Sequence, residues 1–151
     1  MSLRALPMMM LALGLSAGSA AAAGATPDCT GASTQAELDA CASGSFAQAD
    51  AELNRVWRAI QSRYADQPLF LARLKTAQKA WLAFRDAEVA ARFPLAPGQS
   101  AQAEYGSVFP MCQDQFKAVL TAERTAQLKA WLEGVAEGDV CAGSVKPAPL
   151  P

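Results

Sequence analysis

The chain has 151 residues, the length of a single domain, and a formal net charge of −1. This balance disfavours nucleic acid as a partner, because proteins that bind nucleic acid present a strongly basic surface. The sequence contains no histidine, so it lacks the commonest general base, the commonest zinc ligand and the usual partner of a catalytic serine.

Residues 1–25 have the pattern of a secretory signal peptide. Arg4 precedes the apolar run MMMLALGL and the small residues SAGSAAAAGA, and cleavage after Ala23 or Ala25 fits the pattern. The apolar run is too short to span a bilayer. Removal of Arg4 leaves 12 basic and 14 acidic residues, a net charge of −2. Cys29 follows TPD and not a lipobox, so we expect a periplasmic or secreted protein without a membrane anchor.

Helical patterns begin in the expected domain, residues 26–141. The segment TQAE is a capping box, with Thr34 as N-cap and Glu37 at the third helical position. We expect a short helix from Gln35 to about Ala42, which SGS then interrupts or bends. The apolar stripe that follows has a period of 3.6 residues and comprises Phe46, Ala49, Leu53, Trp57, Ile60 and Tyr64.

A second long helix follows the stop signal ADQP, with Pro68 in its first turn. Its expected apolar side comprises Leu71, Leu74, Ala77, Trp81, Phe84 and Glu88. It should end near Arg92, because Phe93 precedes a proline. The short connection predicts that the two long helices are antiparallel neighbours.

The rest of the chain predicts a loop, a further helical region and a tail. Residues 94–110 are rich in proline, glycine and serine. Residues 111–136 have a helical pattern, and residues 142–151 are expected to be a disordered tail. No strand pattern is present, so the predicted fold class is all-α: a small disulfide-stapled helical bundle built on a long antiparallel helical hairpin.

The four cysteines indicate structural disulfides, as expected for a small exported protein. Their spacing lacks both the C-x-x-C of redox motifs and the paired knuckles of zinc sites, although a site made of the four thiols is an alternative. We predict that Cys29 pairs with Cys41 and Cys112 with Cys141. The second pair requires the last helix to break near Leu120, with Thr121 capping a new segment.

Polar residues interrupt the apolar face of the expected hairpin. In an antiparallel hairpin, Asp50 would lie nearly opposite Arg85, and Asn54 nearly opposite Gln78. Trp81 lies on the same face of the second helix as Gln78 and Arg85. We predict that the two members of each pair form polar contacts with each other across the hairpin, and that these contacts determine its register. The alternative is that these residues form a ligand site.

These segments also resemble a known family. TQAELDAC and FAQADAELN, then LKTAQKAWLAFRDAE, then YGSVFPMC and LTAERTAQL occur in an order that resembles the LprI-like lysozyme inhibitor domain family. The resemblance covers about residues 29–132. It implies a small, helical, exported bacterial protein that contains cysteines. The family usually has a cysteine shortly after RDAE, where this chain has Val89.

The resemblance also implies a set of signature positions. They are Cys29, Gln35, Cys41, Asp50, Leu53, Asn54, Gln78, Trp81, Arg85, Asp86, Cys112, Thr121 and Arg124. By the hairpin geometry, most of them have architectural roles.

The function that the resemblance implies is that of an exported binding protein that inhibits lysozyme by occluding the enzyme. One alternative is a general cell-envelope interaction module with another protein partner. The other is a carboxylate-based hydrolase, but no spacing of acidic residues marks an acid–base pair. We expect no catalytic residue, no cofactor and no metal.

If the protein blocks a cleft, the 94–110 loop is the best candidate for the contact. It is long for a helix connection, and it carries Tyr105, Val108 and Phe109. These residues are the predicted partner-binding set. The alternative is that they fold back as a lid over the bundle.

Overall fold

The computed structural model describes residues 29–149, and that part of the chain forms four helices. They are α1 (Gln35–Arg63), α2 (Pro68–Arg92), α3 (Ala101–Tyr105) and α4 (Phe109–Glu133). The predicted all-α class is confirmed; within residues 29–149 the sole β-type pairing is an isolated bridge between Val135 and Pro147. The predicted signal peptide lies outside the described residues.

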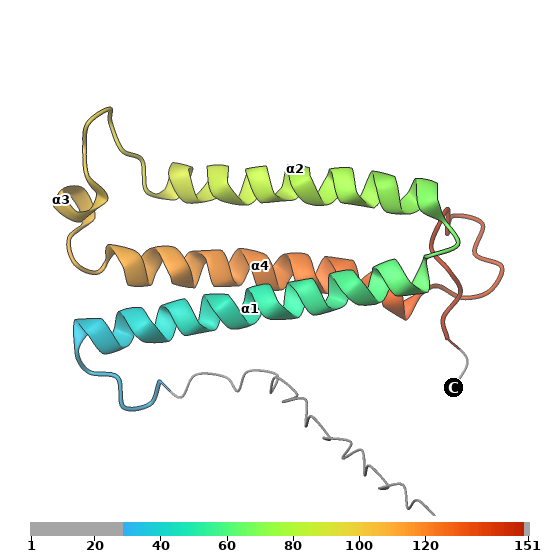
Figure 1. Ribbon diagram of the computed structural model, residues 1–151, viewed down its shortest axis with the longest axis horizontal. Coiled ribbons are helices and arrows are strands. Elements are labelled where there is room, and N and C mark those ends of the chain that lie inside the picture. Colours follow the sequence, from blue (N-terminus) through green and yellow to red (C-terminus); the bar gives the residue numbers. More distant parts are fainter. Residues whose placement is uncertain (1–28, 150–151) are drawn as a thin grey trace, which may run out of the picture.

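Three long helices lie side by side (Figure 1). As predicted, α1 and α2 are antiparallel and joined by a short turn, whereas α4 runs parallel to α1. The closest packing is between α1 and α4, not within the hairpin; α2 lies farther from both. Small residues favour this approach, and Ala49 of α1 and Ala118 of α4, both partly buried, line a shallow depression between the two helices.

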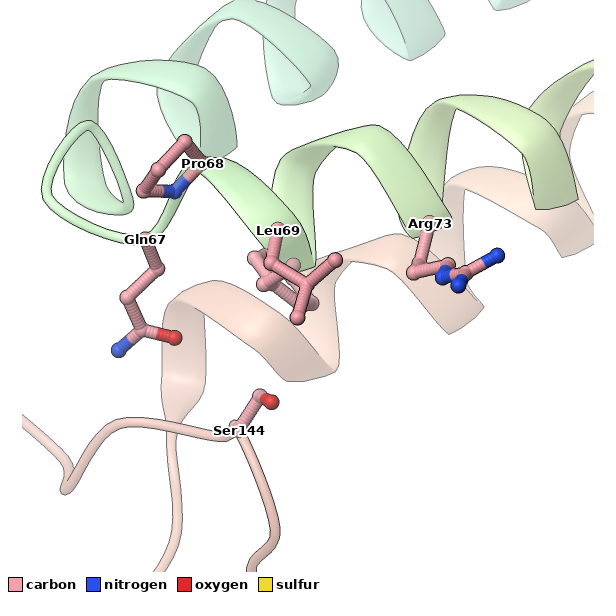
Figure 2. Close-up of a pocket in the computed structure, with 6 residues that line it drawn as sticks. Gln67, Pro68, Leu69, Arg73 and Ser144 are labelled. Atoms are coloured by element: carbon pink, nitrogen blue, oxygen red, sulfur yellow. The ribbon is translucent and has the colours of Figure 1, made fainter.

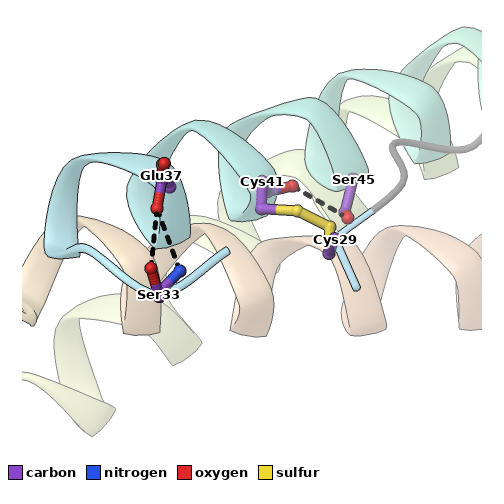
Figure 3. Close-up of a disulfide and its surroundings, with 5 residues drawn as sticks. All are labelled: Cys29, Ser33, Glu37, Cys41 and Ser45. Carbon is purple, nitrogen blue, oxygen red and sulfur yellow. Dashed lines mark hydrogen bonds between the residues drawn. A yellow bond between two sulfur atoms is a disulfide. The ribbon is translucent and has the colours of Figure 1, made fainter. Parts of the chain in front are cut away.

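The start of α1 is held by the predicted capping box. The backbone amide of Glu37 donates to Thr34 Oγ1 at 3.3 Å, and Thr34 N donates back to the Glu37 carboxylate at 2.9 Å. Ser33 N donates to the same carboxylate at 2.9 Å (Figure 3). These backbone donors stabilise the ionised form and lower the pKa of Glu37 to about 2.

The predicted disulfide between Cys29 and Cys41 is present, with Cα atoms 5.9 Å apart (Figure 3). The predicted interruption at SGS is wrong, because α1 continues unbroken to Arg63. Ser45 Oγ donates to the carbonyl of Cys41 at 3.0 Å, which satisfies the hydroxyl inside the helix. Tertiary packing of this turn, where Ala42 is buried, outweighs the weak helix propensity of the segment.

The hydrophobic core is concentrated in the half of the bundle nearest the α1–α2 turn. Its buried members are Leu53, Val56, Ile60, Tyr64, Leu74 and Leu128. Partly buried aromatic residues pack around it, and Phe70 lies 4.5 Å from Tyr64 and 4.7 Å from Trp131 between ring centroids. Phe84, expected on the apolar side of the second long helix, is instead 53% exposed.

The predicted pairing of Cys112 with Cys141 is wrong, and both thiols are free. Helix α4 does not break at Thr121; that residue is fully buried in mid-helix, and its carbonyl accepts from Thr125 Oγ1 at 2.8 Å. Cys112 lies in the first turn of α4, and Cys141 follows its other end. At ~1.5 Å per residue, the helix separates them by about 30 Å.

The C-terminal segment 142–149, predicted to be disordered, instead folds back onto the α1–α2 turn. Lys146 Nζ donates to the carbonyl of Arg63 at 2.8 Å and forms an ion pair with Asp66 at 2.6 Å. Lys146 N donates to Tyr64 Oη at 3.0 Å. We call residues 142–149 the strap. It holds this end of the bundle without a covalent bond, whereas the disulfide holds the start of α1.

The double variant Cys29→Ser, Cys41→Ser should lose ~3 kcal/mol of unfolding free energy, because the closed loop constrains the unfolded chain. Urea denaturation measures the loss. The control is Cys112→Ser, which removes a free thiol and should change stability little. A peptide map that joined Cys112 to Cys141 would contradict the structure.

Gly134→Ala should lose about 1–3 kcal/mol from backbone strain and detach the strap as well. Gly134 has φ 77° and ψ −171°, and an added Cβ would lie 2.6 Å from the carbonyl oxygen of Lys146. The control is Gly138→Ala, at φ 86°, where nothing lies within 4 Å. Equal losses by denaturation for the two variants would show that the strap is not docked against Gly134.

Candidate partner-binding surface

The 94–110 loop is ordered around the short helix α3. Ser100 caps α3, accepting from the amide of Ala103 at 3.2 Å, and Gln99 accepts from the amide of Ala96 at 2.7 Å. Tyr105 Oη donates to the carbonyl of Pro94 at 2.6 Å and so ties the end of α3 to the start of the loop. The loop therefore has a defined shape of its own.

Two of the three predicted partner-binding residues take part in an aromatic cluster. The ring of Phe93 meets those of Tyr105 and Phe109 edge to face, at centroid distances of 5.5 Å and 5.3 Å. Tyr105 and Phe109 stack on each other at 5.8 Å. Both are half-buried, while Val108 is 43% exposed. The aromatic pair thus holds the loop together, and Val108 is left at the surface.

A groove lies beside this cluster, between the end of α2, the loop and the start of α4. Its volume is about 520 Å³. Its apolar wall consists of Val89, Ala90, Phe93, Pro94, Leu95 and Phe109. Asp86 and Gln113 supply its polar groups. We call it the loop-end groove. Sequence patterns do not predict this groove. The one signal is Leu95, an apolar residue in a loop, which the structure leaves 42% exposed.

A second groove, of about 400 Å³, lies at the opposite end of α2, beside the strap (Figure 2). Pro68, Leu69 and Phe70 form its apolar part, and Gln67, Arg73 and Ser144 its polar part. We call it the strap-end groove. Each end of α2 therefore carries an apolar depression, one with an acidic residue and the other with a basic residue.

The signature residues do not form the predicted polar pairs. Asp50 accepts from Asn54 Nδ2 at 2.9 Å within α1, and Gln78 accepts from Arg124 Nε of α4 at 3.0 Å. Arg85 donates to Asp86 and not to Asp50. Both predicted pairs are wrong because the prediction assumed that α1 and α2 are in close contact, whereas α2 lies apart from α1.

The guanidinium of Arg85 lies on the inner face of α2, where it contacts two aromatic rings. Its Cζ lies 5.7 Å from the ring centre of Phe46 in α1 and 5.5 Å from that of Trp81. Its side chain is only 13% exposed, while that of its ion-pair partner Asp86 is 65% exposed. The inner face thus holds a cation over aromatic rings, and the carboxylate that balances it faces outward.

Other cations have the same role in this half of the bundle. Arg92 of α2 lies 4.3 Å from the ring centre of Phe116 in α4, and Lys117 lies 5.6 Å from that of Phe46. Arg124 has neutral hydrogen-bond partners, Gln78 and Gln127. Desolvation lowers the pKa of its guanidinium. Cation–π contacts and hydrogen bonds to side-chain amides therefore join α2 to its neighbours where the apolar core ends.

Several carboxylates with lowered pKa values stabilise the structure as anions. Hydrogen bonds from Arg55 and then Lys129 lower the pKa of Glu52 to about 2, and the bond from Lys146 lowers that of Asp66. Such groups are ionised at neutral pH, unlike a general acid, whose pKa is raised toward the working pH. Within residues 29–149, no group of three or more potential ligands could hold a metal ion.

The fold and surface define a small, all-α, single-disulfide domain that presents apolar grooves at its ends. No helix in residues 29–149 is both long and apolar enough to cross a membrane. A family model described as lysozyme inhibitor LprI matches residues 26–128, and the chain belongs to this family. The predicted resemblance is confirmed. The members of this family are inhibitors rather than enzymes.

A relative is also found in Rhizobium meliloti (strain 1021). The chain is 36% identical over 118 residues to an uncharacterized protein of this organism. The aligned segment covers 71% of the chain and 80% of the relative. No solved structure matches the chain.

Arg85→Ala should lose about 1–2 kcal/mol of stability, because two cation–π contacts of a mostly buried guanidinium disappear. The loss should stay moderate, since Asp86 is exposed and is not left as a buried charge. Arg85→Lys should recover only part of it, because an ammonium lacks the planar stacking group. The control is Asp86→Ala, which should cost less than ~1 kcal/mol. Equal losses for Arg85→Ala and Asp86→Ala in urea denaturation would contradict this role.

Proposed function

We propose that this protein is an exported, non-enzymatic binding protein that inhibits lysozyme by occluding the enzyme. Membership of the lysozyme inhibitor family supports the target. The signal-peptide pattern of residues 1–25 supports export to the periplasm or the medium. The Cys29–Cys41 disulfide is typical of such an oxidising compartment.

A binding role agrees with the surface of the described domain. Its carboxylates with lowered pKa values hold helix ends and helix pairs together, which is a structural use of charge. Its ends carry apolar grooves and exposed aliphatic side chains such as Val108 and Leu95. Residues of this kind, placed on a stiff loop, suit a protein contact because little conformational freedom is lost on binding.

The single observation that carries the proposal is the family match over residues 26–128. In this proposal, the three predicted partner-binding residues no longer all contact the partner directly. We infer that Tyr105 and Phe109 act mainly by shaping the 94–110 loop, because each contacts the other and Phe93. Val108, exposed between them, would contact the partner directly.

The test is the lysis of a peptidoglycan suspension by lysozyme in the presence of the purified mature protein. Lysis should slow as the molar ratio rises and reach a plateau near stoichiometric binding, with several lysozyme types compared. The double variant Tyr105→Ala, Phe109→Ala should inhibit less, because the loop loses its aromatic support.

The control is Phe84→Ala, which removes an exposed aromatic ring from the outside of α2. Unchanged lysis at a large excess of wild-type protein would contradict the proposal and favour a general envelope module with another partner. Inhibition that survives the loss of both loop aromatics would leave the function standing and place the contact elsewhere.

A further inference from the structure

We propose that the loop-end groove is the docking site for a basic segment of the lysozyme surface, with an arginine or lysine stem on its apolar wall and the charged head at Asp86. This inference rests on the proposed function and assigns its contact surface. It differs from the sequence-based expectation, in which the loop aromatics themselves are the anchors.

The shape of the groove is largely fixed before any partner arrives. Phe93 and Phe109 belong both to its wall and to the aromatic cluster. The hydrogen bond from Tyr105 to Pro94 holds the loop segment that contributes Pro94 and Leu95 to the wall. A wall built in this way loses little conformational entropy when it is covered, and this favours affinity.

The charge at the groove selects the sign of the partner. Asp86 is 65% exposed, and Arg85, its ion-pair partner, is turned into the bundle with 13% exposure. An incoming cation therefore meets the carboxylate first. The strap-end groove has a comparable volume and similar apolar content, but its charged residue is Arg73. A basic lysozyme surface is attracted to the first groove and repelled by the second.

The combination of wall and charge suits one kind of side chain. Arginine and lysine have long apolar stems that pack on hydrophobic surface while the head group stays at a polar edge. Phe93, Pro94 and Leu95 offer the surface, and Asp86 the polar edge. Leu95, 42% exposed, would be covered by the partner, as expected for a residue near the centre of a contact.

The experiment measures binding of the folded mature protein to a basic animal lysozyme by calorimetry, at two salt concentrations. Leu95→Lys should raise the Kd about tenfold or more, because it removes an apolar contact and adds a like charge. Asp86→Asn should weaken binding several-fold and reduce its salt dependence. Both residues are at the surface, and circular dichroism with a thermal melt checks that each variant is folded.

The matched control is Leu69→Lys, an even more exposed leucine (71%) in the strap-end groove at the other end of the same helix. It should change the Kd less than twofold. Equal effects of Leu95→Lys and Leu69→Lys, or a larger effect of Leu69→Lys, overturn the docking site while leaving lysozyme binding intact. An absence of lysozyme binding by the wild-type protein overturns the proposed function, and the docking site with it.

Discussion

The close, parallel packing of α1 against α4 is the constraint on which the rest of the structure depends. Small side chains favour such an approach, and α4 buries two threonines, Thr121 and Thr125. Leu53, Val56 and Ile60 of α1 and Leu128 of α4 then close the core. Lys129 of α4 adds a 3.0 Å ion pair with Glu52 of α1. The third long helix, α2, does not come as close to either of them.

Helix α2 is therefore held at a larger distance by long and aromatic side chains. Phe70 bridges to Tyr64 and Trp131 near the α1–α2 turn, and Arg85 reaches Phe46 near the opposite end. A helix held in this way leaves unfilled space at its ends, where the connecting segments begin. The two grooves lie at these ends, so the surface available to a partner follows from the unequal packing of the bundle.

The two ends of the bundle are stabilised by different interactions. The disulfide fastens the chain before α1 to the second turn of that helix, and its effect is on the unfolded chain as much as on the folded one. The strap uses Lys146, which places its ammonium at the C-terminal end of α1, where helix carbonyls carry partial negative charge. It lies beyond residues 26–128, which the family model matches, and so is a feature of this chain outside the matched segment.

Much of this protein was determined locally and could be predicted from the sequence alone. The capping box at Thr34 and the end of α2 before Pro94 each depend on residues a few positions apart, and the Cys29–Cys41 disulfide joins residues that are 12 positions apart. The all-α class follows from the periodicity within each helical segment. The order of several such segments was enough to identify the family. Local rules failed where tertiary packing overrode them, as in the SGS segment of α1 and at Thr121 in α4.

Only the tertiary structure decided which helices are close neighbours. Hairpin connectivity predicted α1 against α2, but the structure packs α1 most closely against α4, a helix that follows it only after the chain has turned twice. That choice assigns Gln78 of α2 to Arg124 of α4. The unbroken α4, in turn, keeps Cys112 and Cys141 about 30 Å apart. The loop-end groove combines residues of α2, the loop and α4, so no periodicity within one segment could reveal it. Sequence patterns report which face of a helix is apolar, whereas the fit between side chains determines which helix covers that face.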